Sequence, residues 1–324
     1  MMKINNTFTY QFLGRKLFFI LFLSLGLISS ANCETLSNKT KISIMQKWEQ
    51  APNGYVYPID IIVPENSLEK MPVAILLHGA GGEGQNILDE FEGMALNHIL
   101  IAPTGFQGFW NIANEPSDAP DTKFIAELVR VLKNFTNIDK NRIRIIGASN
   151  GSALANRIMI EVDDPGIDII VSFISQMTNG QYHNGNFYYP SNGTGGNREF
   201  EGYDTIKIPK KGRRFLSISS INDNVVPYEG GPNYQIGTSW IDSQESIFAI
   251  ANSQGYRGKK LKDSEGVRYQ SSDTFIYSYL DGQVVHAKGT ASHGMDRSLE
   301  EVIKFYLNNP ANKIESINTT LNSD

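Results

Sequence analysis

The sequence is poor in cysteine and has no excess of positive charge, and both shortages restrict what the protein can be. Cys33 is the only cysteine among 324 residues, so the chain cannot close an internal disulfide and must be stabilised by its core. The 29 lysines and arginines are outnumbered by 34 acidic residues, a net charge of −5. Binding to a nucleic-acid backbone depends on basic patches, so nucleic acid is not an expected partner. Hydrophobic residues make up 40% of the chain, which is enough for a sizeable core.

Long apolar runs are also scarce, and the one near the N-terminus is short. Residues 17–30 read LFFILFLSLGLISS, a run of 14, whereas a membrane-spanning helix needs about 20 residues. A basic segment without acids precedes the run at residues 1–16, and small residues follow it. This order is typical of a secretory signal peptide. We expect residues 1–33 to be removed, which leaves 26 basic and 34 acidic residues, a net charge of −8 and no stable membrane span.

The predicted export places the mature chain outside the cell, or in the periplasm if the host is Gram-negative. Lipidation of Cys33 is an alternative to simple cleavage, but the preceding residues 30–32, Ser-Ala-Asn, match a lipoprotein signal poorly. The sequence leaves the cleavage position and the fate of Cys33 open.

Beyond residue 53, short apolar runs alternate with amphipathic segments. The expected strands are residues 55–63, 73–77, 99–102, 143–146, 169–174 and 215–218, and the expected helices are residues 121–135, 152–162 and 296–307. Pro58 suggests that the first strand bends or lies at an edge. Unbroken apolar strands separated by helices indicate a doubly wound α/β fold with a mostly parallel sheet, in which sites form beyond the carboxyl ends of the strands. We expect one catalytic domain over residues 34–310 and a flexible polar tail over 311–324.

Residues 178–214 break this alternation. They are rich in glycine, asparagine and tyrosine and show little regular pattern. A connection of this length is often a functional loop, so the segment could be a lid or could contact substrate through its tyrosines. An ornamental surface insertion explains the composition equally well, and the sequence leaves the two open.

Residues 147–151, Gly-Ala-Ser-Asn-Gly, carry the clearest chemical signal. They fit the pattern G-x-S-x-G and stand between an apolar strand and a helix, where a nucleophilic serine requires them. The serine must occupy a sharp turn, and side chains at the two flanking positions would collide with backbone. The alternative is a glycine-rich turn with a capping serine. We predict that Ser149 is the nucleophile.

A serine hydroxyl needs a base, and in this fold the base follows the nucleophile in the sequence. Three of the five histidines do so. His183 belongs to the irregular segment, and His286 lies in an expected strand, where a structural role is more common. His293 lies in a loop before the last helix, where the catalytic histidine belongs. We therefore predict His293 as the base.

The histidine in turn needs a carboxylate to orient it. Asp223 follows the expected strand at residues 215–221 directly, although an aspartate at this place can also serve as a turn residue. Asp242, in an expected helix, and Asp281, in an expected hairpin turn, are weaker alternatives. Asp223 is the predicted acid.

Two backbone N–H groups should hold the oxyanion of an ester intermediate. One is expected from Asn150, next to the nucleophile, and the other from Ala80 in the loop at residues 78–82, with Gly81 as the alternative donor. His78 is expected to shape this loop. The same loop also satisfies G-x-G-x-x-G, the pattern of a dinucleotide site, but no acid ends the following strand to bind a ribose. We expect no cofactor and no metal centre.

Five motifs together carry a family resemblance. They are LLHGAGG at 76–82, FWNIANEPSDAPD at 109–121, IDKNRIRIIGASNGSALANR at 138–157, NDNVVPYEGG at 222–231 and SHG at 292–294. In this order they resemble the secreted polyhydroxybutyrate depolymerase-like esterases, a group of α/β-hydrolases that includes feruloyl and acetylxylan esterases. The resemblance spans residues 55–308. It implies a Ser149–Asp223–His293 triad and places Trp110 and Asn111 at the substrate.

The predicted protein is therefore a secreted serine esterase that acts on a small ester, a polyester or an acylated polysaccharide. Many relatives carry cysteines beside these motifs, and this chain has none there, so the natural ester stays open. A serine peptidase and a non-catalytic binding protein on the same fold are the alternatives.

Overall fold

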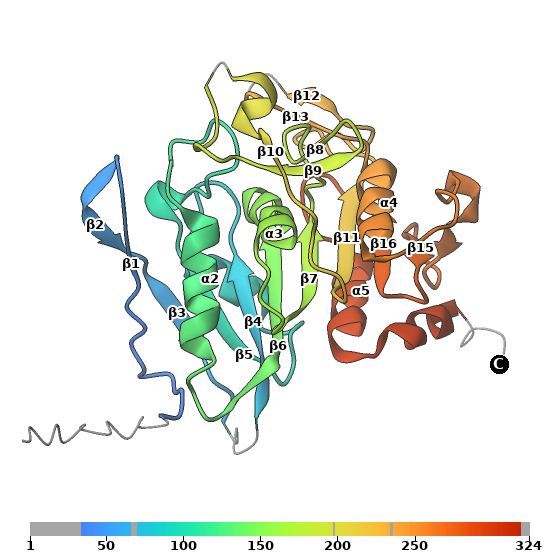
Figure 1. The fold of residues 1–324 in the computed structure, drawn as a ribbon. Helices are drawn as coiled ribbons and strands as arrows, with labels where there is room; N and C mark the ends of the chain where they lie inside the picture. The colour runs from blue at the N-terminus through green and yellow to red at the C-terminus, as the bar shows by residue number, and fades with distance from the viewer. Residues whose placement is uncertain (1–33, 66–69, 197, 234–235, 319–324) are drawn as a thin grey trace, which may run out of the picture. The chain divides into compact units, whose positions relative to one another are not determined.

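A nine-stranded sheet with helices on both faces forms the body of the protein (Figure 1). The computed structural model describes residues 34–65, 70–196, 198–233 and 236–318. The predicted signal peptide at residues 1–33 lies outside the described residues. Cys33–Asp324 forms one compact unit.

The elements follow one another along the chain in this order: β1 (Met45–Trp48), β2 (Ala51–Val56), β3 (Ile59–Ile62), β4 (Met71–Leu77), α1 (Gly84–Phe91), β5 (Ile99–Pro103), η1 (Phe106–Gly108), α2 (Asp121–Leu132), β6 (Ile138–Ala148), α3 (Asn150–Glu161), β7 (Ile167–Phe173), β8 (Tyr182–His183), β9 (Asn186–Tyr189), η2 (Glu199–Gly202), β10 (Thr205–Ile206), β11 (Arg214–Ser220), β12 (Gly231–Asn233), β13 (Thr238–Trp240), α4 (Ser243–Gln254), η3 (Asp263–Glu265), β14 (Val267–Arg268), β15 (Phe275–Tyr279), β16 (Val284–Gly289), α5 (Arg297–Asn308) and η4 (Ala311–Asn318).

The order of strands across the large sheet is β14-β15-β16-β11-β7-β6-β4-β5-β3. The six strands from β16 to β5 are parallel to their neighbours, while β3 at one edge and β15 and β14 at the other are antiparallel. The expectation of a mostly parallel, doubly wound sheet is confirmed. Because the central strands run in one direction, their carboxyl ends meet along one edge of the sheet.

Strand β4 shows how apolar runs build the two layers of core. Its odd-numbered residues Val73, Ile75 and Leu77 pack with α2, α3 and α4, whereas Ala74 and Leu76 pack with α1 and α5. Successive side chains of a strand point to opposite faces, so a strand that is covered on both sides must be apolar throughout. In Figure 1, α2, α3 and α4 lie together in front of the sheet.

The expected strand at residues 55–63 is divided in two. β2 pairs with β1 in a separate hairpin, and β3 pairs with β5 at the edge of the large sheet. The division falls at Tyr57 and Pro58, since proline has no N–H for a ladder. The bend and the edge position suggested by Pro58 are both present.

Two segments are more ordered than their composition indicates. The insertion at residues 178–214 contains a small antiparallel sheet with the strand order β10-β9-β8. The expected flexible tail begins with η4, in which Ile314 is only 3% exposed and joins the core on the side of α5. The expectation of a loose tail from residue 311 is wrong for this part, because one apolar side chain anchors it.

Candidate active site

The predicted site residues all follow strands of the parallel part of the sheet. The loop at residues 78–83 follows β4, Ser149 follows β6, Asp223 follows β11 and His293 follows β16. These segments are far apart in the sequence, but their strands end at the same edge of the sheet. The topology therefore brings them together.

Ser149 occupies a strained turn between β6 and α3. Its φ of 53° and ψ of −116° lie in a region that non-glycine residues rarely adopt. The two glycines of the motif make the turn possible: a Cβ on Gly147 would lie 2.1 Å from the Gly151 oxygen, and one on Gly151 would lie 2.1 Å from the Leu77 oxygen. The predicted steric clash of a side chain with backbone is therefore confirmed at both Gly147 and Gly151.

His293 links the serine to the carboxylate. Its Nε2 lies 2.9 Å from Ser149 Oγ, and its Nδ1 lies 2.8 Å from Asp223 Oδ2. The other carboxylate oxygen of Asp223 accepts the N–H groups of Val225 at 2.8 Å and Val226 at 2.9 Å. The Asp223 side chain is only 1% exposed, and these hydrogen bonds fix its carboxylate. The carboxylate can therefore accept the Nδ1–H of His293, which leaves His293 Nε2 free to take the serine proton.

The alternative histidines are structural. His286 is fully buried between Ser217 and Tyr228, and burial lowers its pKa to about 3. His183 is stacked between the rings of Tyr188 and Phe200, with centroid distances of 3.8 and 3.7 Å.

The alternative acids have other roles. Asp242 lies just before α4 rather than inside a helix, and its side chain caps that helix by accepting the Glu245 N–H. Asp281 lies in the tight turn between the antiparallel strands β15 and β16, as expected, with a φ of 51°.

Ala80 and Asn150, the two predicted oxyanion donors, line the same cavity as Ser149. Among the described residues no acceptor is present for the N–H of Ala80 or of Asn150, the first residue of α3. The N–H of Gly81 donates to the Gly108 oxygen and that of Gly82 to the Gly79 oxygen. Gly81 is therefore not available as the alternative donor, and the loop offers neither N–H to a dinucleotide phosphate.

His78 fixes the orientation of this loop. Its Nδ1–H donates to the Gly79 oxygen at 2.7 Å, and its Nε2 accepts the Gly105 N–H at 3.0 Å, so the ring is neutral, and burial lowers its pKa. In a trans peptide the C=O and the following N–H point in opposite directions. By holding the Gly79 carbonyl, His78 turns the Ala80 N–H away from its own ring, and Ala80 lines the cavity at Ser149.

A cavity of about 320 Å³ opens at Ser149. Its lining is mainly apolar and comes from the loop after η1, from α3, and from the segments that follow β7 and β11. The lining residues are Ala80, Phe109, Ile112, Asn114, Glu115, Pro116, Ser149, Asn150, Ala153, Ser175, Thr178, Val225, Val226, Ile236, Thr238 and Trp240. A mainly apolar cavity beside a serine that is hydrogen-bonded to a histidine can bind the acyl or the alcohol group of an ester.

The assignment of Trp110 and Asn111 to substrate contact is wrong. Trp110 is 0% exposed, and its indole N–H donates to the His78 oxygen. Asn111 is 6% exposed, its amide donates to the Ala119 oxygen, and its side-chain oxygen accepts the Thr194 hydroxyl. The neighbouring side chains Phe109 and Ile112 reach the cavity instead.

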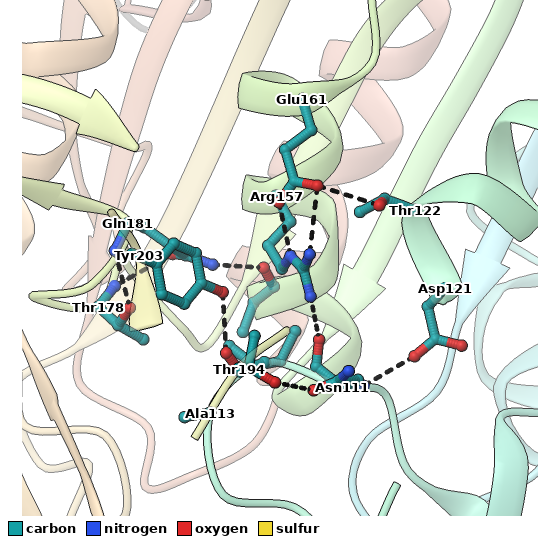
Figure 2. A network of polar contacts seen from close by, with 12 residues as sticks. Asn111, Ala113, Asp121, Thr122, Arg157, Glu161, Thr178, Gln181, Thr194 and Tyr203 are labelled. Atoms are coloured by element: carbon teal, nitrogen blue, oxygen red, sulfur yellow. Dashed lines mark hydrogen bonds and ion pairs between the residues drawn. The ribbon is translucent and has the colours of Figure 1, made fainter. Parts of the chain in front are cut away.

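Residues 109–115 form one wall of the cavity, and a buried polar network supports this wall (Figure 2). The backbone N–H of Asn111 donates to the Asp121 carboxylate at 2.7 Å, and the backbone oxygen of Asn111 accepts a hydrogen bond from the Arg157 guanidinium. The same guanidinium also pairs with Glu161 at 2.7 Å. Tyr203 donates its hydroxyl to the Ile112 oxygen at 2.8 Å. Because Arg157 and Glu161 are both in α3, the wall is tied to the helix that begins next to Ser149.

The insertion at residues 178–214 supports this wall and contributes little to the cavity surface. Thr178 is its one residue among those lining the cavity. Tyr203 is 1% exposed and faces the network of Figure 2, while Tyr182, Phe187, Tyr188 and Tyr189 lie outside the lining. Of the roles that the sequence left open for this segment, substrate contact through its tyrosines does not apply to this cavity.

Glu115 is a lining residue that the sequence did not single out. Its carboxylate accepts the N–H groups of Ile112 at 3.0 Å and Ala113 at 2.6 Å and the Asn150 amide at 3.1 Å. Burial raises its pKa. It stands in the motif at residues 109–121, but nothing in that motif distinguishes it from Asp118 or Asp121.

No protein-family model and no curated protein sequence match the chain. Among solved structures, the acetyl xylan esterase from Aspergillus awamori gives a TM-score of 0.51 at 14% identity, over 76% of this chain and 93% of that chain. The Bacillus cereus carboxylesterase gives 0.48 at 15% identity, over 77% and 93%. A carboxylesterase from Mesorhizobium loti gives 0.46 at 13% identity, over 78% and 95%.

At these identities the likeness concerns the fold. Together with the sheet order and the turn at Ser149, it defines the chain as an α/β-hydrolase fold. Within the described part of the chain, no helix is long and apolar enough to cross a membrane. Nor do the described histidines, cysteines and acids form a group of three or more suited to a metal ion.

Proposed function

We propose that the protein is a serine hydrolase that cleaves carboxylic esters. The observation that carries the proposal is the continuous chain of hydrogen bonds from Ser149 Oγ through His293 to the buried Asp223. A serine that merely stabilised a turn would not need an imidazole at 2.9 Å with its own buried carboxylate. The apolar cavity that includes Ser149 adds support.

The reaction takes two steps. His293 Nε2 removes the Ser149 proton while Oγ bonds to the ester carbonyl carbon, and the N–H groups of Ala80 and Asn150 hold the resulting oxyanion. Asp223 stabilises the imidazolium, which then gives its proton to the leaving alcohol. Water, deprotonated by the same imidazole, attacks the acyl carbon. The bond from that carbon to Ser149 Oγ then breaks, the imidazolium returns its proton to Oγ, and the carboxylic acid leaves.

The substrate is proposed more narrowly from the motif resemblance. The motifs of this chain are similar to those of polyhydroxybutyrate depolymerase-like, feruloyl and acetylxylan esterases. The proposed natural substrate is accordingly a small soluble ester, a polyester or an acylated polysaccharide. The N-terminal sequence supports export to the cell exterior or the periplasm. N-terminal sequencing of protein recovered from the culture medium tests export, since a chain that begins at Met1 would contradict it.

A panel of esters tests the activity. Short acyl p-nitrophenyl esters, hydroxybutyrate oligomers, methyl ferulate and acetylated xylan are compared with peptide substrates, using wild type and Ser149→Ala. We expect hydrolysis of at least one ester class by wild type alone. Faster cleavage of peptides would indicate a peptidase, and failure of a fluorophosphonate to label Ser149 would indicate a binding protein.

A further inference from the structure

The cavity at Ser149 is one-sided in its charge. Most of its lining is apolar. Besides Ser149, its polar residues are three with hydroxyls (Ser175, Thr178 and Thr238), two with amides (Asn114 and Asn150), and Glu115, which contributes a carboxylate. None of the described lining residues is a lysine, an arginine or a histidine. A charged group that enters this space from water therefore meets a carboxylate and no compensating cation.

The carboxylate of Glu115 is fixed in place and is not neutralised by a partner. Its three hydrogen bonds come from two backbone N–H groups and the Asn150 amide, which are all uncharged donors. Arg157 favours the charged form of Glu115 from a distance. The Arg157 guanidinium donates its hydrogen bonds to Glu161 and to the backbone oxygen of Asn111, and Arg157 is not among the residues that line the cavity.

A second carboxyl lies behind the lining residue Thr238. Glu201 accepts the hydroxyl of Thr238, and its other oxygen is buried without a hydrogen-bond partner among the described residues. Burial raises the pKa of Glu201, and the charge of Glu115 raises it further, so the two carboxyls are close enough to interact. Glu201 therefore supplies no positive charge that would offset Glu115.

We propose that Glu115 determines the charge specificity of the site: the cavity accepts neutral and cationic acyl groups and rejects anionic ones. This inference rests on the proposed esterase function. An anionic acyl group would lose its hydration and would also be repelled by the carboxylate of Glu115, and both effects oppose binding. A cationic group would gain the attraction of Glu115 and could also contact the aromatic rings of Phe109 and Trp240.

Three matched substrates test the proposal. They are p-nitrophenyl esters whose acyl groups have three methylenes and end in a tert-butyl, a trimethylammonium or a carboxylate group. kcat/KM is measured at pH 8, with the Ser149→Ala protein as the background. For wild type we expect the anionic ester to react at least about tenfold more slowly than the neutral one, and the cationic ester to react no more slowly than the neutral one.

Variants assign the effect to Glu115. Glu115→Gln removes the charge and keeps an acceptor for the backbone donors. We expect it to lower the ratio of kcat/KM for the neutral ester to kcat/KM for the anionic ester about tenfold. Asp118→Asn is the matched control, because it removes a charge from the same loop at an exposed residue outside this cavity, and it should leave the ratio unchanged. Ile236→Lys adds a cation at a lining residue that is 39% exposed, and it should narrow the ratio without depending on the Glu115 contacts.

The outcomes separate this inference from the proposed function. Absence of hydrolysis of all three esters above the Ser149→Ala background overturns the esterase assignment and with it the inference. Hydrolysis of the neutral and anionic esters at similar rates by wild type overturns the charge specificity alone. A ratio that neither Glu115→Gln nor Ile236→Lys narrows, or a cationic ester that is the slowest of the three, does so as well.

Discussion

The backbone strain at Ser149 predicts that this residue lowers the stability of the fold. With φ at 53° and ψ at −116°, it occupies a region that costs a non-glycine residue about 1–3 kcal/mol, whereas glycine adopts it with little strain. Ser149→Gly and Ser149→Ala both remove the hydroxyl and its bond to His293. The two variants differ only in the Cβ, so the difference between them reports the strain.

The expected difference follows from two opposing terms. Glycine relieves about 1–3 kcal/mol of strain but gives the unfolded chain more freedom, which costs about 0.5–1 kcal/mol relative to alanine. With the middle values of these two ranges, the free energy of unfolding of Ser149→Gly should be about 1 kcal/mol higher than that of Ser149→Ala, while both lack esterase activity.

Urea denaturation followed by fluorescence measures this difference. The comparison requires equal slopes of the unfolding free energy against urea concentration, because a changed slope would indicate a changed unfolded state. A Ser149→Gly protein that is no more stable than Ser149→Ala would refute the view that the nucleophile is held in a strained conformation.

Further predictions concern the relay, the turn and the buried network. Asp223→Asn keeps the size of the side chain but favours the wrong tautomer of His293, so kcat should fall by about 10⁴ while KM changes little; a fall below tenfold would contradict the relay. Gly151→Ala places a Cβ 2.1 Å from the Leu77 oxygen and should lower the free energy of unfolding by about 1–3 kcal/mol, measured by denaturation. Burial raises the pKa of Asp121 from 3.8 to about 7, so the carboxyl stabilises the fold fully below pH 4, and this contribution is lost as the pH rises towards 7. Asp121→Asn should remove that decline from stability measured between pH 4 and 7, and a decline of unchanged slope would show that Asp121 does not cause it.

The central sheet and the relay could be predicted because their signals are local. Short apolar runs such as residues 73–77, separated by helical segments, indicate strands covered on both faces, and the structure confirms this strand. The order Ser149, Asp223, His293 then follows from where strands end, since each residue directly follows a strand or lies a few positions beyond one.

The walls of the site could not be predicted in the same way. Trp110 and Asn111 stand in the right segment, but Phe109 and Ile112 on either side of them reach the cavity. The Trp110 indole is instead directed to the His78 oxygen, and Asn111 belongs to the network around Arg157. That direction depends on hydrogen bonds to Asp121, Thr194 and Asn150, which are distant from one another in the sequence. Spacing alone does not contain this information. The same holds for η4, where the burial of Ile314 depends on the three-dimensional neighbours of α5.

The hydrogen bonds behind residues 109–115 have a consequence for how this cavity can adapt to a different ligand. Replacing Asn111, Arg157 or Tyr203 would leave buried donors and acceptors without partners, so this side of the cavity tolerates little variation. The part of the lining formed by Val225, Val226 and Ile236 presents aliphatic side chains that can be exchanged for one another at small cost. Directed evolution towards larger or smaller esters should therefore accumulate its substitutions in that aliphatic part of the lining and spare the wall.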